Sequence, residues 1–489
     1  MSNIIPEKKI IPKYPLTDDE KEILALVDEN EEGIVKLLQQ MVQIESLNFS
    51  EFIFTERNEI FAFTEKFMNE SGFKTELFRI PFPGGKEDEF YYNLISSIEG
   101  EFPGKTLQFN GHLDIVPFNP DTWDEDTSPL SGVIKDGKLF GRGSFDMKAG
   151  IACQMIAMKL LKNSGNKIKG KLQLWLTPDE ETHGAYGSKF MTMNHLDVIK
   201  ANATVVSEPT TSRPLQSPYI GIAEKGPHWL RFTFHGAAGH GSWPKERSSA
   251  LNKAIRFMSH AKRKLKIPKY PAPISKKQNK IMLKKRVNLK EYKKEQAKII
   301  SQNPYDKDKR SSENLYKTTF SFNMINAGIK INVIPDTCIL EIDFRTMPGL
   351  KTQELLDAIV KYCSKLKYKI ELPENFRNLQ YSQSKFKEEP VDITLSLITI
   401  GEGSSIDPNS DFGVLLQHTF EAIYEVKPIF TFNTGFTDAG NMREAGLENT
   451  FVVGPGGRGA HSSNEYVELD TLKDLTKLYL LVAYRYLSK

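Results

Sequence analysis

Hydrophobic residues along this chain follow two alternating periods, which together predict a sheet covered by helices. Apolar side chains spaced by three and four residues predict helices over residues 20–41, 56–72 and 148–162. Two-residue alternation and short apolar runs predict strands at residues 73–80, 105–110, 171–176, 203–207 and 451–454. Because strands that alternate with helices are typical of an open α/β sheet, we expect an α/β main domain with a central mixed sheet flanked by helices.

The pattern changes after residue 219, where a second group of strands and helices begins. Leu230, Phe232 and Phe234 alternate with polar residues. Further strands are predicted at residues 318–323 and 337–344, and helices at residues 248–263 and 351–366. Two strand-and-helix units predict a small α+β (ferredoxin-like) domain inserted into the first. We therefore assign residues 220–405 to a lid domain. The main domain then comprises residues 1–219 and 406–489, and it resumes with helices at residues 411–424 and 439–444.

Residues 264–317 of this insert are rich in lysine, with basic clusters at residues 276–277, 284–286 and 293–294. A basic run can bind nucleic acid or dock on a partner. No aromatic interleaving accompanies these lysines, and the whole chain has a formal net charge of only +3. We therefore favour a solvated excursion over an interaction segment, and we expect no nucleic-acid partner.

Length and composition narrow the class of protein. A chain of 489 residues is too long for one ordinary core, and 39% hydrophobic with 26% charged residues is typical of a soluble globular protein. The cysteines, Cys153, Cys338 and Cys363, are scattered and odd in number, which argues against a disulfide framework. The first 18 residues lack the apolar core of a signal peptide, and no stretch is apolar over the length of a membrane span. We expect a cytoplasmic protein with no membrane partner.

Groups that can bind a metal follow four of the predicted strands. These groups are His112, the acidic run at residues 179–181, Glu208 and His461. Since sites in open α/β sheets lie at the carboxyl ends of strands, we expect the four groups to converge. Asp146, just before a predicted helix, adds a further carboxylate. Two histidines and three carboxylates (those of Asp146, Glu181 and Glu208) suit Zn²⁺ or a neighbouring first-row ion. If one carboxylate is shared, they would form two co-catalytic sites about 3.5 Å apart.

Each of these residues taken alone also has an ordinary structural explanation. His112 and Asp114 stand two residues apart, so in an extended backbone their side chains point the same way. The carboxylate would then fix the tautomer of a metal-binding histidine, or the two would form a hydrogen-bonded surface pair. Glu181 and Glu208 could be exposed or loop acids, and His461 could be a turn residue. Only their combination favours a metal site.

Several different short motifs contain these residues or lie between them, and together they span most of the chain. They are Gly-His-Leu-Asp-Ile-Val-Pro at 111–117, Gly-Arg-Gly-Ser-Phe-Asp-Met-Lys-Ala-Gly at 141–150, Asp-Glu-Glu-Thr-His-Gly at 179–184, Ser-Glu-Pro-Thr at 207–210, Gly-His-Gly-Ser-Trp-Pro at 239–244, Asn-Val-Ile-Pro at 332–335, Asp-Phe-Arg at 343–345 and Ala-His-Ser-Ser-Asn-Glu at 460–465. In residue types and order they resemble the M20 metallopeptidase and amidohydrolase family. That family includes acetylornithine deacetylases, succinyl-diaminopimelate desuccinylases, aminoacylases and glutamate carboxypeptidases. The N-terminal arm and the Lys-rich excursion match it poorly.

The resemblance implies a zinc-peptidase-like catalytic domain that holds two Zn²⁺ ions, with Co²⁺ or Mn²⁺ as alternatives. Asp146 would bridge the two ions. His112 and Glu208 would complete one site, and Glu181 and His461 would complete the other. A glutamate at position 208, rather than aspartate, is what the deacetylase, desuccinylase and aminoacylase branches have.

The resemblance also assigns catalytic roles to three residues. Asp114 would orient His112, and Glu180 would be the general base. His240 in the lid would stabilise the developing oxyanion, and in some relatives it reaches the partner subunit's site in a homodimer. The chemistry is consistent, because a metal-bridged water has a pKa lowered towards neutrality and a nearby carboxylate can take its proton.

Three further residues are candidates for binding substrate. The planar guanidinium of Arg345 suits a carboxylate, with help from Asn332. Pairing of Arg345 with Asp343 or Glu341 on its own strand is an equally good alternative. Arg458 lies in a glycine-rich loop beside His461, where backbone N–H groups could also hold an anion.

We expect this protein to hydrolyse an amide bond of an N-acyl amino acid or short peptide. A deacylase is the first prediction, and a carboxypeptidase or dipeptidase is the alternative. A metal-binding scaffold or pseudoenzyme is the alternative from another class, although all five ligands and Glu180 are present. A two-metal phosphoesterase is disfavoured because the sequence offers no convincing set of phosphate clamps around the site.

Overall fold

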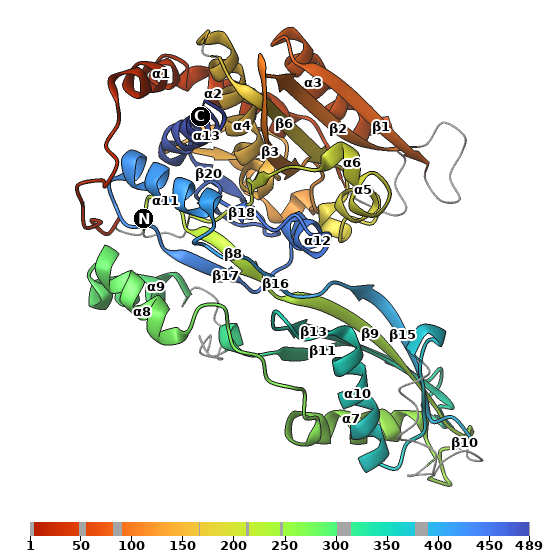
Figure 1. Ribbon diagram of the computed structural model, residues 1–489. Coiled ribbons are helices and arrows are strands. Elements are labelled where there is room, and N and C mark those ends of the chain that lie inside the picture. The colour runs from red at the N-terminus through yellow and green to blue at the C-terminus, as the bar shows by residue number, and fades with distance from the viewer. Residues whose placement is uncertain are drawn as a thin grey trace.

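The computed structural model describes residues 4–47, 55–81, 90–165, 167–211, 215–244, 248–300, 314–376 and 390–488. Two sheets dominate it, a large one of nine strands and a smaller one of five. Figure 1 shows them in two bodies, joined where strands β8 and β9 run on from one another. The predicted α/β class with a mixed central sheet is confirmed.

The large sheet has the strand order β1-β2-β6-β3-β7-β18-β8-β16, with β17 paired to β8. Its strands are β1 Lys74–Pro81, β2 Phe90–Glu99, β3 Phe102–His112, β6 Lys169–Thr177, β7 Ala203–Val206, β8 Ile220–Glu224, β16 Ser404–Ser405, β17 Phe430–Asn433 and β18 Thr450–Val452. β6, β3, β7 and β18 are neighbours and parallel, whereas β1, β2 and β6 pair antiparallel. Four carboxyl ends therefore meet at one edge of the sheet.

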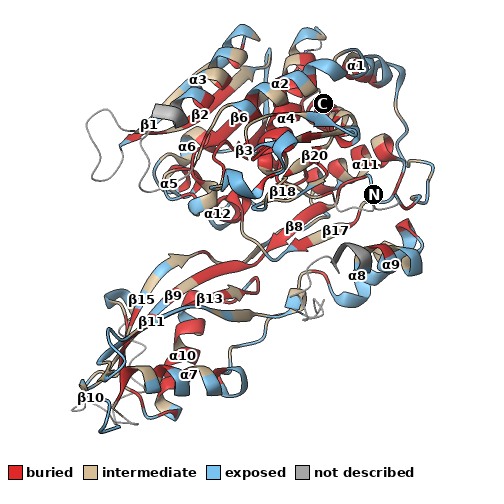
Figure 2. Cartoon of the chain, turned by 180° about the vertical axis from the view of Figure 1, so that it is seen from behind, coloured by how far each residue is buried: buried red, intermediate tan, exposed pale blue. Residues whose placement is uncertain are grey.

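Helices cover both faces of this sheet. They are α1 Asp18–Glu29, α2 Glu31–Gln43, α3 Thr55–Glu70, α4 Ala149–Asn163, α5 Ser188–Asn194, α6 Leu196–Ile199, α11 Asp411–Tyr424, α12 Asp438–Glu444 and α13 Leu472–Leu487. α4 and α13 pack on each other and on β3 and β6, and the ring of Phe109 meets that of Tyr479 on this face. The preceding residue of β3, Gln108, points the other way and donates to the Ile199 carbonyl of α6. Figure 2 shows these strands and α4 as the buried centre.

The helical pattern over residues 20–41 corresponds to two helices rather than one. α1 begins at a capping box between Thr17 and Glu20 and ends at Asn30. The backbone N–H of Asn30 donates to the Val27 carbonyl, and its side chain donates to that of Leu26. These local bonds close α1 before α2 begins, an outcome that apolar spacing alone does not reveal.

The smaller sheet has the order β11-β13-β9-β15-β14. Its strands are β9 Gly226–His235, β11 Thr319–Ala327, β13 Thr337–Thr346, β14 Ile370–Glu371 and β15 Ile393–Ile400, and α7 Ala250–Lys264 and α10 Thr352–Lys365 cover one face. Phe257 of α7 packs between Phe232, Phe234 and Tyr362. At the far end, β10 Gly239–His240 pairs with β12 Val333–Ile334. β8 and β16 pair with each other in the large sheet. The chain therefore passes into the smaller body after residue 224 and returns before residue 404, a few residues from the predicted limits of 220 and 405.

The Lys-rich segment forms two helices, α8 Lys276–Arg286 and α9 Leu289–Ile300, and residues 301–313 lie outside the described part. Its lysine clusters are exposed, but Arg286 and Val287 are fully buried. The expected solvated excursion is therefore wrong for the described residues, because the other face of these helices packs on the main body. In the ranges that the structure describes, no helix is long and apolar enough to span a membrane.

Candidate metal centre

Three strand ends and two loops bring the predicted ligands together. His112 ends β3, Glu181 follows β6 and Glu208 follows β7. Asp146 and His461 come from loops tied by a small sheet of β4 Ile134–Lys135, β5 Lys138–Phe140, β19 Gly457–Arg458 and β20 Tyr466–Glu468. The parallel order of β6, β3, β7 and β18 explains the convergence, since parallel strands end at the same edge.

His112, Asp146 and Glu208 form the first half of the cluster. Nε2 of His112 lies 3.3 Å from Oδ1 of Asp146 and 3.4 Å from Oε1 of Glu208. Nδ1 of His112 lies 2.9 Å from the carbonyl oxygen of Asp114. Because a carbonyl only accepts, Nδ1 must carry a proton, which makes Nε2, facing the carboxylates, the nitrogen that could bind a cation.

Asp146, Glu181 and His461 form the second half. Nε2 of His461 lies 2.9 Å from Oε2 of Glu181 and 3.6 Å from Oδ2 of Asp146. The two oxygens of Asp146 thus face two different histidines. The His461 side chain is 58% exposed and that of His112 is 1% exposed, so the cluster is closed on the sheet side and open on the His461 side.

The carboxylates of this cluster repel one another. Burial, followed by the charge of Glu208, raises the pKa of Glu180 well above its ordinary value. Burial, followed by the charge of Asp146, raises the pKa of Glu208 to about 8. Ligand atoms of His112, Asp146 and Glu208, and those of Asp146, Glu181 and His461, lie within 4.8 Å of one another in each group. Divalent cations in these two groups would offset the repulsion, and the oxygen and imidazole donors fit Zn²⁺ and its neighbours.

Asp114 holds more than the imidazole. Its carboxylate lies 3.3 Å from Nδ1 of His112, and it also accepts the backbone N–H groups of Glu180 at 3.2 Å and Glu181 at 3.1 Å. One buried carboxylate therefore ties the end of β3 to the loop that carries Glu180. The sequence predicted only the contact with His112.

Arg142 and Glu465 form a second support that sequence reasoning missed, although both lie in the quoted motifs. Oε1 of Glu465 accepts the backbone N–H groups of Phe145 and Asp146, each at 3.0 Å. Its other oxygen pairs with the buried guanidinium of Arg142 at 2.6 Å. Since Glu465 is four residues from His461, this pair fixes the backbone of Asp146 relative to the His461 loop.

Asp438, at the start of α12, is another buried acid that received no predicted role. It accepts hydrogen bonds from the hydroxyls of Thr177 and Ser188, and burial raises its pKa. The only sequence signal was an acid at the start of the helix predicted at residues 439–444. Its bonds join the end of β6 to α5 and α12.

A model of peptidase family M20/M25/M40 matches residues 108–485. The chain belongs to this family. An uncharacterised metallohydrolase of Methanococcus maripaludis is 26% identical over 377 residues, which are 77% of this chain and 80% of that protein. An acetylornithine deacetylase of Photorhabdus laumondii is 27% identical over 322 residues, 66% of this chain and 69% of that protein. The dipeptidase Dug1p of Saccharomyces cerevisiae has the same fold, with a TM-score of 0.71 and 18% identity over 96% of this chain and 99% of that chain.

The lid residues predicted for this M20 metallohydrolase lie in two different places. His240 and Asn332 are together at the far tip, where Gly241 N–H donates to the Asn332 carbonyl at 2.8 Å. Nδ1 of His240 lies 2.7 Å from the Ser242 hydroxyl. Within one chain, this tip is far from the cluster of candidate metal ligands at the edge of the large sheet (Figure 1). Arg345 is at the root of the lid and pairs with Asp343 at 3.0 Å, as the alternative interpretation had it.

Arg345 nevertheless lies near the loop of residues 179–184, which follows β6. Burial, followed by the charge of Arg345, lowers the pKa of His183 to about 4. His183 is two residues from Glu181, and its ring meets the lid residue Trp229 edge-on at 4.3 Å. The smaller body therefore contacts, through Trp229 of β9, the loop that carries Glu180 and Glu181.

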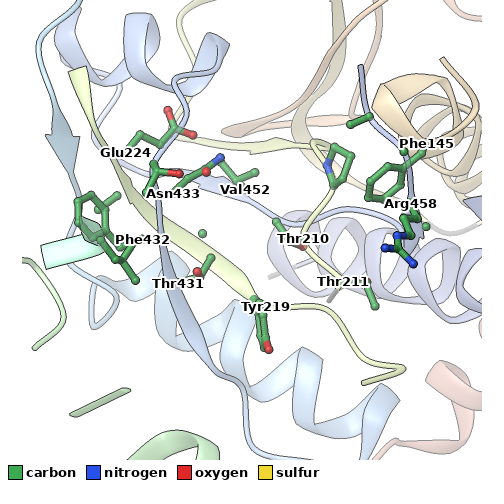
Figure 3. A pocket seen from close by; sticks show the side chains of 18 of the residues that line it. Phe145, Thr210, Thr211, Tyr219, Glu224, Thr431, Phe432, Asn433, Val452 and Arg458 are labelled. Carbon is green, nitrogen blue, oxygen red and sulfur yellow. The ribbon is translucent and has the colours of Figure 1, made fainter. Parts of the chain in front are cut away.

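A pocket of about 490 Å³ opens beside the metal cluster (Figure 3). Its lining includes Phe145, Pro209 and Ala460, which are the chain neighbours of Asp146, Glu208 and His461. Arg458 also lines it, as does Tyr219. A pocket of this size is typical of small-molecule sites and adjoins the reacting groups. Of the three predicted substrate-binding residues, the structure thus places Arg458 in this pocket, Arg345 at the lid root and Asn332 at the lid tip.

Proposed function

We propose that this M20 metallohydrolase binds two divalent cations, with Zn²⁺ preferred and Co²⁺ or Mn²⁺ as alternatives, and hydrolyses an amide bond of an N-acyl amino acid or short peptide. The observation that carries the proposal is the position of Asp146, whose two oxygens face His112 and His461 separately. His112, Asp146 and Glu208 would hold one cation. Asp146, Glu181 and His461 would hold the other.

Glu180 is the proposed general base. When bound, the cation pair would polarise the amide carbonyl and lower the pKa of water. Oε2 of Glu180 lies 4.0 Å from Nε2 of His112, beside the ligands, and Asp114 holds its backbone. Its carboxylate would accept the proton of the attacking water and then donate it to the leaving nitrogen.

The substrate branch is the second part of the proposal. A deacylase comes first, supported by the similarity to an acetylornithine deacetylase, and a carboxypeptidase or dipeptidase is the alternative. The test is a panel of N-acetyl amino acids, N-succinyl diamino acids and unmodified dipeptides with protein loaded with Zn²⁺ or Co²⁺. Hydrolysis of one group identifies the branch. If metal-loaded protein cleaves no member, the scaffold alternative gains support.

The three cysteines are free and buried, which supports a reducing compartment such as the cytoplasm.

We further propose that residues 220–405 act as a lid and that two lids form a homodimer. β11 is an edge strand of the lid sheet, and Met324 and Ile325 on it are exposed. Ile329 and Ile331 beside it are 94% and 102% exposed. An exposed apolar edge of this kind supports pairing with a second copy, which would bring His240 to the partner's site as an oxyanion donor.

Mixing two inactive variants tests this arrangement. His240→Ala and Glu180→Gln chains, dissociated and reassociated together, are expected to regain about a quarter of the activity of the unmodified protein, because half of the dimers are mixed and each then has one complete site. Each variant alone is the control. The measurement is specific activity combined with light scattering of the eluted protein. A monomer, or a mixture no more active than its components, would contradict the proposal.

A further inference from the structure

A buried ion pair joins the N-terminal arm, residues 4–16, to the Lys-rich helices. Nε of Arg286, at the end of α8, lies 2.5 Å from Oε2 of Glu7. The Arg286 guanidinium also donates to the carbonyls of Ser217 at 2.6 Å and Pro218 at 3.2 Å. Glu7 in turn accepts the N–H groups of Gln216 and Ser217. Burial opposes the charge of Glu7, yet Arg286 holds the pKa of Glu7 below its ordinary value.

Apolar packing reinforces this ion pair. Ile5 of the arm, Leu215, Val287 of the Lys-rich segment and Ile429 form a buried cluster, each no more than 2% exposed. The Lys8 N–H donates to the Arg286 carbonyl at 2.7 Å. The arm and the helices are thus attached to the segment that leads into β8. Breaking a buried pair of this kind is costly, since the remaining charge has no partner.

One of these helices, α9, reaches the pocket beside the candidate metal ligands. The hydroxyl of Tyr219, a residue that lines the pocket, lies 3.0 Å from the hydroxyl of Tyr292 on α9. Gln296, one turn further along α9, and Leu315 also line the pocket. Lys225, next to the lining residue Glu224, donates to the carbonyls of Asn314 and Lys317, each at 2.6 Å. The segment that contains α9 and Leu315 is therefore bonded to both ends of β8, through Tyr219 before it and Lys225 after it.

We propose that the Lys-rich helices, held by the N-terminal arm, form a fixed specificity wall, and that it selects substrates that extend beyond an acetyl group. In this wall Gln296 lines the pocket, and Tyr292 holds the lining residue Tyr219. This inference rests on the proposed amide hydrolysis. The ligand-side lining, Phe145, Pro209 and Ala460, and the α9 side, Gln296 and Leu315, belong to one pocket of about 490 Å³. An acetyl group beside the ligands would fill only a small part of this volume.

The chemistry of the wall indicates what the distal group is. Near α9 it presents the Tyr219 hydroxyl, which is bonded to that of Tyr292, and the Gln296 amide, with Thr431 and Asn433 on the facing strand β17. These groups are uncharged donors and acceptors, which match the amide groups of a peptide better than a charged or purely apolar chain. Within the proposed amide hydrolysis, the wall therefore favours the peptidase alternative, or a deacylase for peptide-like acyl groups, because the preferred substrate has an additional amide beyond the scissile bond.

Substrates of graded length test the wall. N-acetylalanine, dialanine and trialanine would be assayed with the unmodified protein and with Gln296→Leu, Tyr292→Phe and the control Lys294→Gln, whose side chain is on the exposed face of α9. Loss of one hydrogen bond is expected to lower kcat/KM for trialanine about 5-fold and to leave N-acetylalanine within about 2-fold. Equal effects on both substrates, or no effect on either, would overturn the inference.

Binding measured without turnover separates this inference from the proposed function. In a metal-loaded Glu180→Gln background, calorimetric titration is expected to show trialanine binding about 5-fold more weakly when Gln296→Leu is added, with N-acetylalanine unchanged. This result would uphold the wall even if the unmodified protein cleaves none of the three compounds, which would be a failure of the proposed function alone. Unchanged trialanine affinity would overturn the wall.

Discussion

Glu180→Gln is expected to lower kcat about 10³-fold while the protein keeps its metal content, because general-base catalysis typically contributes this much. Glutamine keeps the shape of the side chain but cannot accept a proton. It also leaves the backbone N–H of residue 180 free to donate to Asp114 as before. The measurement is steady-state hydrolysis of the best substrate of the panel, with the metal-to-protein ratio determined on the same sample.

Glu22→Gln, on the exposed side of α1, is the matched control and should leave kcat unchanged. Full activity in the Glu180→Gln protein would exclude Glu180 as the base. Loss of activity together with loss of bound metal would instead make Glu180 a ligand. Glu180 is close enough to the other groups to be a ligand instead of the base, since ligand atoms of His112, Glu180 and Glu181 also lie within 4.8 Å of one another.

Asp146→Ala is expected to remove both cations and to lower activity at least about 10³-fold, because the shared carboxylate contributes a ligand to each site. Oδ1 of Asp146 faces His112 and Oδ2 faces His461. Glu181→Ala should release the cation of the His461 half only. Metal content by mass spectrometry, after dialysis against a fixed free Zn²⁺ concentration, measures both outcomes.

Asp197→Ala, at an exposed position of α6, controls for removal of a surface carboxylate. Loss of one equivalent of metal from both Asp146→Ala and Glu181→Ala would indicate that Asp146 serves a single site. Thermal unfolding of the metal-free variant should stay close to that of the metal-free parent, since the cluster lies on a large preformed sheet.

The ends of the predicted strands were the most informative feature of the sequence. Residues 105–110, 171–176, 203–207 and 451–454 correspond to β3, β6, β7 and β18. Apolar residues alternate with others in β3 and β6, and residues 203–206 and 451–453 are short apolar runs, so each stretch stands out from the polar residues that follow. Position along the chain was therefore enough to collect His112, Glu181, Glu208 and His461 as candidates.

Contacts between distant segments were the least predictable feature. Glu465 is bonded to the backbone of Asp146 across 319 residues, and Glu7 is paired with Arg286 across 279 residues. Periodicity describes which face of a helix is buried but does not say against what. For the same reason the many lysines of α8 and α9 gave no indication in the sequence that the other face of these helices packs on the main body.

The sequence by itself determined the α/β class, the family, the inserted second sheet and the set of metal-binding residue types, because these depend on local periodicity and on short motifs. Only the tertiary structure decided that Asp146 stands between two histidines, that His240 and Asn332 are distant from the cluster within one chain, and that α9 reaches the pocket. The physical reason is that these features depend on where separate elements meet in space, and burial and hydrogen bonding between them outweigh local sequence preference.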